Sequence, residues 1–507
     1  MGQARAVAIF GTGSDVGKSL NVAGICRLLS RKGIRVAPFK AQNMALNSFV
    51  TLDGGEIGRA QALQAQACGI EPTVEMNPIL LKPESDLRSQ VVVRGKVYEA
   101  LDALAYFERK ETLFNIVREC YDRLATEYEC VVIEGAGSAA EINLRDRDIV
   151  NWPVVELADA SIVLVADIDR GGVFAQIIGT LDLLAPHERK RMLGVIVNKF
   201  RGDRRLFADG VRMLEERTGL PVLGVVPYLR ELRLDQEDSV DLVRFRSVQF
   251  KPNLINVGVV LLPRMSNFTD FNALAAERDV ALRLAASPDD LRGADVVILP
   301  GSKNTLEDLN YLVTSGFPGA LESHVQKGGE LVGLCGGYQM LGQEITDPKG
   351  LERGGTSIGL GFLDVTTELD APKICRQVRA RSLLRGVEQH APVRGYEIHM
   401  GRTSRGTANP CFQMEGSEIW EDTARDDEGA ASENGRVWGT NIHGLFDQAG
   451  FRRGWLNRAR GQKELSLISP RETELVTTHL CAELDRWADH LAQYVKMDAI
   501  YSVFEGQ

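Results

Sequence analysis

The sequence has no apolar run long enough to cross a membrane. Its longest apolar stretches, such as VVILP and VGVVLLP, have the length of strands, whereas a membrane-spanning helix needs about 20 apolar residues. The N-terminus also lacks a basic segment followed by an apolar core, so no secretory signal is expected. Internal repeats and low-complexity tracts are absent as well. We therefore expect a cytoplasmic protein.

Cysteine is sparse, and basic charge is in deficit. The eight cysteines are scattered without paired spacing, at Cys26, Cys68, Cys120, Cys130, Cys335, Cys375, Cys411 and Cys481. Such scattering is typical of reduced thiols and argues against a disulfide framework or a zinc site. The chain has 59 Lys and Arg against 69 Asp and Glu, a net charge of -10. This balance argues against nucleic acid or an anionic membrane as the main partner.

The length and the hydrophobic pattern predict two α/β domains. A chain of 507 residues suits two to four domains. Val- and Ile-rich runs separated by helical patterns indicate parallel sheets covered on both faces. Such runs occupy residues 4–10, 34–39, 130–137, 161–168, 193–200 and 222–228, and then 256–263, 295–302, 330–337 and 436–444. We predict a first domain over 1–232, a linker over 233–253, a second domain over 254–450 and a C-terminal helical segment over 451–507.

A phosphate-binding loop is predicted directly after the first apolar run. Residues 11–19 read GTGSDVGKS and open a helical pattern, the setting that such a loop needs. Glycines let backbone N–H groups turn toward phosphate, and the helix N-terminus adds positive potential. Lys18 would reach the β- and γ-phosphates, and the Ser19 hydroxyl would ligate Mg²⁺. The rest of the loop comprises Gly11, Thr12, Gly13, Asp15, Val16 and Gly17. Five residues instead of four separate the two outer glycines, and a glycine-rich helix cap is the alternative.

Two later runs end in polar residues suited to the same site. Glu134 ends CVVIE, where a carboxylate can hold the metal ion of a nucleoside triphosphatase; a cap at the strand end is the alternative. Asn198 and Lys199 end LGVIVNK, where they would recognise the nucleotide base, although Asn-Lys pairs are also common on surfaces. Asp53 and Glu56 could contact metal or substrate, but we expect solvated loop carboxylates.

A cysteine nucleophile is predicted in the second domain. Residues 333–339 read GLCGGYQ after an apolar run, the small-x-nucleophile-x-small pattern of a strained elbow. Side chains at Gly333 and Gly337 would clash with the neighbouring strand and helix. The Gly336 N–H, one residue past Cys335, would form half of an oxyanion hole. A core cysteine is the alternative.

The second oxyanion donor and the base come from other loops. The turn that contains Gly301 and Ser302, after the preceding strand, would supply the donor. A thiol nucleophile also needs a base. His443 is the best-placed histidine because it follows the apolar run VWGTNI in a loop, and His399 in GYEIHMG is the competitor.

With these motifs in place, the chain resembles the glutamine-hydrolysing cobyrinic/cobyric acid amidotransferase family over nearly its whole length. Its first half is similar to the P-loop domain of the dethiobiotin synthetase type, whose GT(x)4GK[ST] spacing includes the extra loop residue. The segments characteristic of the cobyric acid branch are FKAQNMALNS, GGEIGRAQALQAQA, SQVVVRG, DIDRGGVFA and NKFRGD.

The second half resembles a class I glutamine amidotransferase. Its GxCxGxQ motif falls on residues 333–339, which makes Gln339 a candidate glutamine-binding residue, and its catalytic histidine falls on His443. In the wider family a glutamate follows that histidine by two residues, but this chain has Leu445 there, as the cobyrinic/cobyric branch does. The resemblance therefore implies a Cys335–His443 dyad without an assigned orienting carboxylate.

The resemblance implies a specific reaction. The b, d, e and g carboxylates of adenosylcobyrinic acid a,c-diamide would be amidated to give adenosylcobyric acid, a step of cobalamin biosynthesis. Four ATP, with Mg²⁺, would activate the carboxylates as acyl phosphates, and four glutamines would supply ammonia. The expected partners are therefore the corrinoid, glutamine and ATP, with the oligomeric state open.

Three other functions share parts of this architecture. An a,c-diamide synthase has the same architecture, but QNMALNS and DIDRGG argue against it. A cell-wall amidotransferase usually divides the two activities between separate chains. A nucleotide-switch ATPase of the partitioning type would use the first half alone, and it would need neither an elbow cysteine nor a loop histidine.

Overall fold

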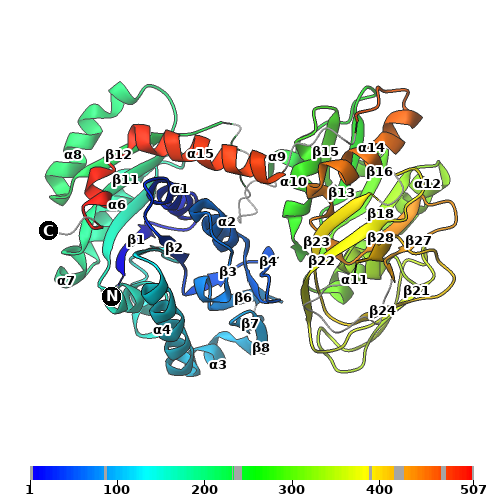
Figure 1. Cartoon of the computed structure of the whole chain (residues 1–507), viewed down its shortest axis with the longest axis horizontal. Coiled ribbons are helices and arrows are strands. Elements are labelled where there is room, and N and C mark those ends of the chain that lie inside the picture. Colours follow the sequence, from blue (N-terminus) through cyan, green and yellow to red (C-terminus); the bar gives the residue numbers. More distant parts are fainter. Residues whose placement is uncertain are drawn as a thin grey trace.

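The chain folds into two lobes that lie side by side (Figure 1). The computed structural model describes residues 4–84, 88–230, 232, 234, 243–387, 391–415, 427–469 and 476–504. The predicted linker, 233–253, therefore lies partly outside the described residues. Within the described ranges, no helix has both the length and the apolar character needed to cross a bilayer.

The N-terminal lobe is built on a parallel sheet of six strands. In sheet order these are β12 (Val222–Pro227), β11 (Met192–Phe200), β10 (Ser161–Asp167), β1 (Arg5–Gly11), β9 (Cys130–Glu134) and β2 (Val36–Phe39). Successive strand residues point to opposite faces. Val7 and Ile9 of β1 therefore pack on one side, and Ala6, Ala8 and Phe10 pack on the other.

Helices cover both faces of this sheet, as its continuous apolar strands predict. One face packs against α1 (Lys18–Arg31) and α2 (Arg59–Cys68). The other face packs against α4 (Lys110–Glu127), α5 (Trp152–Leu157), α6 (Val173–Asp182) and α8 (Ala208–Thr218). The carboxyl ends of the strands are left to the connecting loops, where ligands bind in sheets of this type.

A group of short strands extends from this lobe toward the other one (Figure 1). A four-stranded sheet contains β3 (Gln42–Met44), β6 (Ile79–Pro83), β7 (Arg88–Val93) and β8 (Lys96–Asp102), and a separate hairpin contains β4 (Ser48–Val50) and β5 (Glu56–Gly58). β5 leads directly into α2. The hairpin thus joins the boundary between the lobes to a helix of the N-terminal lobe.

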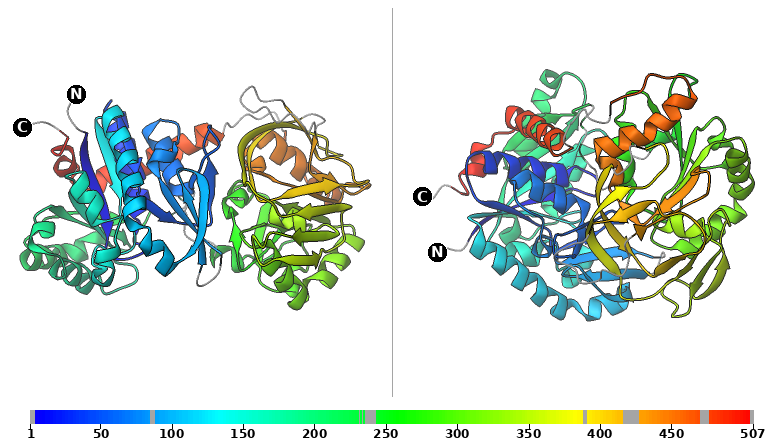
Figure 2. Two further views of the ribbon diagram at one scale, coloured as in Figure 1. Left: turned by 90° about the horizontal axis from the view of Figure 1, so that it is seen from below. Right: turned by 45° about the vertical axis from the view of Figure 1, so that its right-hand side comes forward.

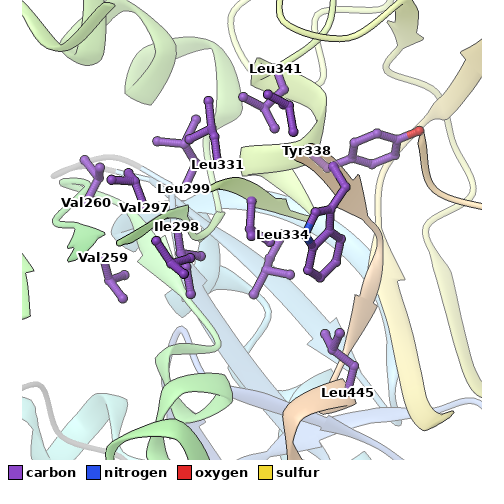
Figure 3. Packing of buried hydrophobic residues seen from close by; sticks show 14 of the residues in the cluster. Val259, Val260, Val297, Ile298, Leu299, Leu331, Leu334, Tyr338, Leu341 and Leu445 are labelled. Atoms are coloured by element: carbon purple, nitrogen blue, oxygen red, sulfur yellow. The ribbon is translucent and has the colours of Figure 1, made fainter. Parts of the chain in front are cut away.

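The C-terminal lobe is built on a second six-stranded sheet. In order its strands are β15 (Val280–Ala285), β13 (Ile255–Val260), β16 (Val296–Leu299), β18 (Glu330–Leu334), β28 (Val437–Thr440) and β27 (Ala430–Ala431), and only the pairing of β27 is antiparallel. Figure 3 shows the core beneath the elbow, where Ile298, Leu299, Leu331 and Leu334 pack with no exposed surface. The predicted α/β fold is confirmed for both halves.

Helices and antiparallel strands complete this lobe. The helices are α9 (Val243–Arg246), α10 (Asn272–Ala275), α11 (Thr305–Thr314), α12 (Phe317–Gln326), α13 (Gly336–Met340) and α14 (Ala449–Gln462). One antiparallel sheet contains β26 (Asp427–Glu428), β25 (Phe412–Met414), β22 (Ile374–Ser382), β23 (Pro392–His399) and β29 (Ile442–His443). Another sheet, of mixed pairing, contains β20 (Gly355–Ile358), β19 (Glu344–Asp347), β21 (Val365–Glu368) and β24 (Arg402–Arg405). Finally, β14 (Met265–Ser266) pairs with β17 (Gly301–Ser302).

The predicted C-terminal helical segment, 451–507, is divided between the lobes. α14 packs on the C-terminal lobe, whereas α15 (Val476–Tyr494) returns to the N-terminal lobe and packs against α1, as the right view of Figure 2 shows. The Trp487 indole donates a hydrogen bond to the Leu20 carbonyl at 2.6 Å. Gly24 allows this close approach, because a Cβ there would lie 2.9 Å from the indole nitrogen.

Candidate active sites

Cys335 lies at a strained turn between β18 and α13. Its backbone angles are φ 51 and ψ -110, a conformation that residues other than glycine rarely adopt. Neighbouring glycines make the turn possible: a Cβ at Gly337 would lie 2.1 Å from the Leu299 carbonyl oxygen, and one at Gly333 would lie 2.7 Å from the Gly337 oxygen. The turn therefore has the geometry expected of a nucleophile elbow.

The strand order of the sheet brings Cys335 close to His443. β18 pairs with β28, and the Cys335 N–H donates to the Thr440 carbonyl at 2.8 Å. His443 follows three residues later, in β29, which pairs with β23. The Cys335 thiol donates to the Ile398 carbonyl of β23 at 3.7 Å. The two predicted catalytic residues thus share one buried corner.

Asp270 supplies the orienting carboxylate that the sequence does not reveal. It lies in the 3₁₀ helix η5 (Phe268–Phe271), and its Oδ2 is 2.6 Å from Nδ1 of His443. Its other oxygen accepts the Gly444 N–H at 2.9 Å, and the Tyr396 ring stacks on the imidazole. Leu445 instead packs in the hydrophobic core (Figure 3). The geometry is that of a Cys–His–Asp triad.

The charges around His443 favour its protonated form. Burial disfavours the imidazolium, but the Asp270 carboxylate and the Cys335 thiol outweigh burial and raise the pKa of His443 to about 10. By contrast, burial lowers the pKa of His399. His443 is therefore the better proton acceptor for the thiol.

Backbone donors suited to an oxyanion lie beside the thiol. Gly336 packs against β17, so that a Cβ on it would lie 2.9 Å from the Ser302 backbone nitrogen. Gly301 lies next to the imidazole, because a Cβ on it would be 3.2 Å from Cε1 of His443. The predicted donors at Gly301, Ser302 and Gly336 are thus gathered around the Cys335–His443 pair.

A cavity of about 500 Å³ opens beside Cys335 and is lined by both lobes. Gln339 is among its lining residues; its side chain accepts from the Thr305 hydroxyl at 3.3 Å and donates to the Met400 carbonyl at 3.3 Å. His399 also lines the cavity, and its Nδ1 has no hydrogen-bond partner among the described residues. The cavity therefore leaves room for a small-molecule substrate beside the thiol.

In the N-terminal lobe, the predicted phosphate loop connects β1 to α1. The Lys18 ammonium donates to the carbonyls of Gly13 and Gly137 at 2.7 and 2.9 Å, and the Ser19 hydroxyl donates to Glu134 at 2.8 Å. A Cβ at Gly13 would meet no atom within 4 Å, so the outer side of the loop is open. These residues fit a nucleotide phosphate chain.

Glu134 has a cation and amides around it. Lys40 and Gln64 donate to its carboxylate at 2.7 and 2.5 Å. Burial opposes the charge, but Lys40 and these hydrogen bonds lower the pKa of Glu134. Among the described residues, no group of three or more His, Cys, Asp and Glu side chains could hold a metal ion. Mg²⁺ usually takes one or two carboxylates together with substrate phosphates, and Ser19 and Glu134 fit that arrangement.

Asn198 and Lys199 lie against the phosphate loop. Asn198 donates to the Val16 carbonyl at 2.8 Å, and its amide occupies the space that a Cβ at Gly17 would need. Lys199 donates to the Asp15 carbonyl and forms an ion pair with Asp167 at 3.1 Å. Both side chains therefore brace the loop, and base recognition stays a prediction.

Comparison with known proteins agrees with this geometry. Residues 7–241 match the model of the CobQ/CobB/MinD/ParA nucleotide binding domain, and residues 256–451 match that of the CobB/CobQ-like glutamine amidotransferase domain. Cobyric acid synthase of Syntrophobacter fumaroxidans is 47% identical over 99% of this chain and 98% of its own length. Those of Streptococcus sanguinis and Klebsiella pneumoniae are 48% identical over 98% of this chain and 98% of their own lengths. The chain belongs to the cobyric acid synthase family.

Glu56, expected to be a solvated loop carboxylate, is instead buried at the boundary between the lobes of this family member. It pairs with Lys82 of its own lobe and with Lys373 of the other lobe, both at 2.6 Å. Burial alone would raise the pKa of Glu56, but the two lysines lower it well below its usual range. Asp53 accepts from the Thr51 hydroxyl and is exposed, as expected.

Proposed function

We propose that this chain amidates the b, d, e and g carboxylates of adenosylcobyrinic acid a,c-diamide, with ATP and glutamine, to give adenosylcobyric acid. One observation carries the proposal: a phosphate loop and a Cys335–His443–Asp270 triad occur in a single chain that is 47% identical to a cobyric acid synthase. A nucleotide-switch ATPase would have no use for the triad, and a free glutaminase would have none for the loop.

The C-terminal lobe would release ammonia from glutamine. Asp270 holds the Nδ1–H of His443, so Nε2 is the atom that takes the proton of the Cys335 thiol. The thiolate attacks the amide carbon, and the backbone donors of Gly336 and Ser302 stabilise the oxyanion. The imidazolium returns its proton to the leaving ammonia, and water then hydrolyses the thioester to glutamate.

The N-terminal lobe would activate the corrin carboxylate. Oxide and hydroxide leave a carboxylate too poorly for direct amide formation, so the γ-phosphoryl group of ATP is first transferred to a carboxylate oxygen. Ammonia then attacks the acyl phosphate, and inorganic phosphate leaves. Lys18 would neutralise charge on the phosphates during transfer. Mg²⁺, held by Ser19 and Glu134, would supply further charge neutralisation.

The cavity beside Cys335 would begin the route of ammonia between the two reactions. Its lining includes Lys82 and Lys96 of the N-terminal lobe as well as Cys335 and Gln339 of the C-terminal lobe. Ammonia in bulk water at neutral pH becomes protonated and loses its nucleophilicity. An enclosed path between the lobes would keep it reactive.

Product analysis tests the proposal. The protein would be incubated with adenosylcobyrinic acid a,c-diamide, glutamine, ATP and Mg²⁺, and the amide positions assigned by mass spectrometry and NMR. We expect new amides at b, d, e and g. A parallel incubation with cobyrinic acid that gave amidation only at a and c, with no reaction of the a,c-diamide, would instead identify an a,c-diamide synthase. ATP turnover with no corrin product would favour the nucleotide switch.

A further inference from the structure

Asn267 lies at the boundary between the lobes, directly before the helix that carries Asp270. Only 2% of its surface is exposed. Its backbone angles of φ 53 and ψ 40 are left-handed, a conformation that asparagine tolerates better than most residues. A buried polar residue held in this conformation requires specific hydrogen bonds on both ends of its amide.

The two ends of the Asn267 amide face different lobes. Its Oδ1 accepts the backbone N–H of Ser48, in β4 of the N-terminal lobe, at 3.0 Å. Its Nδ2 is 3.3 Å from Nε2 of His443. Because a backbone N–H can only donate, the oxygen must face Ser48 and the amide nitrogen must face the imidazole.

The Asn267 amide contacts Nε2 of His443, the atom that has to act as the base. Asp270 accepts the Nδ1–H of His443, which leaves the lone pair on Nε2, and Asn267 donates into that lone pair. The Cys335 thiol meanwhile donates to the Ile398 carbonyl. After proton transfer from the thiol, an Nε2–H and an Nδ2–H would face each other, and two donors repel. Asn267 in this position therefore opposes formation of the thiolate–imidazolium pair.

Ser48 is in turn connected to the nucleotide site. Its hydroxyl donates to Glu56 at 2.7 Å and accepts from Lys82 at 2.9 Å. β4 pairs with β5, which leads into α2. From α2, Gln64 donates to Glu134, the carboxylate that also accepts from the phosphate-loop serine. A displacement of α2 at the nucleotide site would therefore reach β4 and Asn267.

We propose that Asn267 is a positioning residue through which the N-terminal lobe controls glutamine hydrolysis. With Ser48 docked as described, the Asn267 amide holds Nε2 of His443 and opposes transfer of the Cys335 thiol proton to it, against the Asp270 carboxylate, which favours that transfer. Binding of ATP and the corrin carboxylate shifts β4, turns the amide away and frees Nε2. The inference rests on the proposed function and deepens it, because it makes ammonia release conditional on a carboxylate ready to receive it.

Two variants separate this role from a purely structural one. Asn267→Asp keeps the acceptor for Ser48 and tolerates the left-handed backbone, but it presents His443 with an acceptor instead of a donor. Asn267→Gly tolerates the same backbone and removes the amide altogether. Gln377→Ala is the matched control, because Gln377 donates across the same boundary to the Val50 carbonyl of β4 without being bonded to Asn267.

The measurements use the full chain with and without ATP, Mg²⁺ and adenosylcobyrinic acid a,c-diamide. The first is the rate at which iodoacetamide alkylates Cys335, followed by peptide mass spectrometry because other thiols are present. The second is glutamate formed per amide formed. In both Asn267 variants, the rate of Cys335 alkylation without ATP and corrin should rise about three- to tenfold, because one hydrogen bond to the base is lost. Stimulation by the substrates should shrink, and glutamate should exceed amide.

Several outcomes would overturn the role of Asn267. These are an unchanged alkylation rate in both variants, full substrate stimulation in both, or an equal gain in Gln377→Ala, which would assign the effect to loosened docking. Amidation with ammonium in place of glutamine tests the proposed function separately. If the wild type lacked that amidation, the proposed function would fail, while the alkylation rates would still report on Asn267.

Discussion

In the proposed reaction Cys335 only releases ammonia from glutamine, so its loss should affect glutamine-dependent synthesis alone. We expect Cys335→Ala to abolish amide formation with glutamine and to leave amide formation with ammonium largely intact, because carboxylate activation takes place in the other lobe. The check is amide yield with each nitrogen source. Equal loss with both sources would contradict the two-site scheme. His443→Ala should behave in the same way, and a selective loss in His399→Ala instead would move the base to His399.

Loss of the Asp270 carboxylate should reduce glutaminase activity almost as much as loss of His443, to which it is hydrogen-bonded. Asp270→Asn removes the charge beside Nδ1 and lets the imidazole adopt the wrong tautomer. We expect glutaminase activity to fall on the order of 10²- to 10⁴-fold, the usual contribution of acid–base catalysis. Synthesis with ammonium should persist. Wild-type glutaminase activity in this variant would show that His443 needs no orienting carboxylate.

The Asp270–His443 pair predicts that the stability of the folded chain depends on pH. The pKa of His443 is raised to about 10 in the folded chain, against about 6.5 in the unfolded chain. Stabilisation by its protonated form is therefore fully present below pH ~6.5 and is lost as the pH rises toward 10. Thermal unfolding midpoints of wild type and Asp270→Asn should differ most at low pH and converge at high pH. If the difference between the two midpoints did not change with pH, the positive charge assigned to His443 would be contradicted.

Local sequence patterns were enough to predict Cys335, His443 and Lys18 but not Asp270. The first three lie within motifs whose spacing carries the chemistry. Asp270 comes from the short 3₁₀ helix η5 of another strand–helix unit, and FTDF around it has no pattern that marks a catalytic acid. Glu56 was misjudged for a related reason: its sequence neighbourhood is polar, whereas the folded chain pairs it with Lys82 and with Lys373 from the other lobe.

The turn from β18 to α13 depends on its glycines more than on any side chain. Gly337→Ala would place a Cβ 2.1 Å from a backbone oxygen that cannot move without the sheet. We expect a loss of about 1–3 kcal/mol in stability, as for overpacked cores, together with loss of glutaminase. Gly319→Ala, in α12, is the control: its Cβ meets no atom within 4 Å, and Ala in a helix gains about 0.5–1 kcal/mol over Gly. Similar unfolding curves for the two variants would contradict this account.

Strands and helices were predicted unequally for physical reasons. The run 130–137 contains β9 (Cys130–Glu134), because a strand buried on both faces must be apolar throughout. The short strands of residues 42–102 gave no such signal, since only some of their residues, such as Ile79, Leu81 and Val91, join the core of the N-terminal lobe. The position of α15 was equally hidden: a helical pattern shows that one face is buried, but not which lobe covers it.

A substitution in the phosphate loop should have a different effect from one in the triad, because the two sites lie in separate lobes. Lys18→Ala should remove synthesis with both glutamine and ammonium, because one preorganised charge contact typically contributes about 10²- to 10³-fold in rate. Glutaminase should survive in part, since Cys335 and His443 lie in the other lobe. The readout is corrin-dependent phosphate release beside the glutaminase rate. Wild-type phosphate release would show that Lys18 does not bind the transferred phosphate.

The return of α15 to the first lobe has a consequence for synthesis on the ribosome. Residues 32–475 separate α1 from α15, and at ~5–20 residues per second they take roughly 20–90 s to make. For that interval the surface of α1 covered by Trp487 stays open, with the phosphate loop attached to an incompletely packed helix. The lobe that emerges first is thus the last to mature, and the nascent chain can assemble its cysteine elbow before its nucleotide-binding lobe is finished.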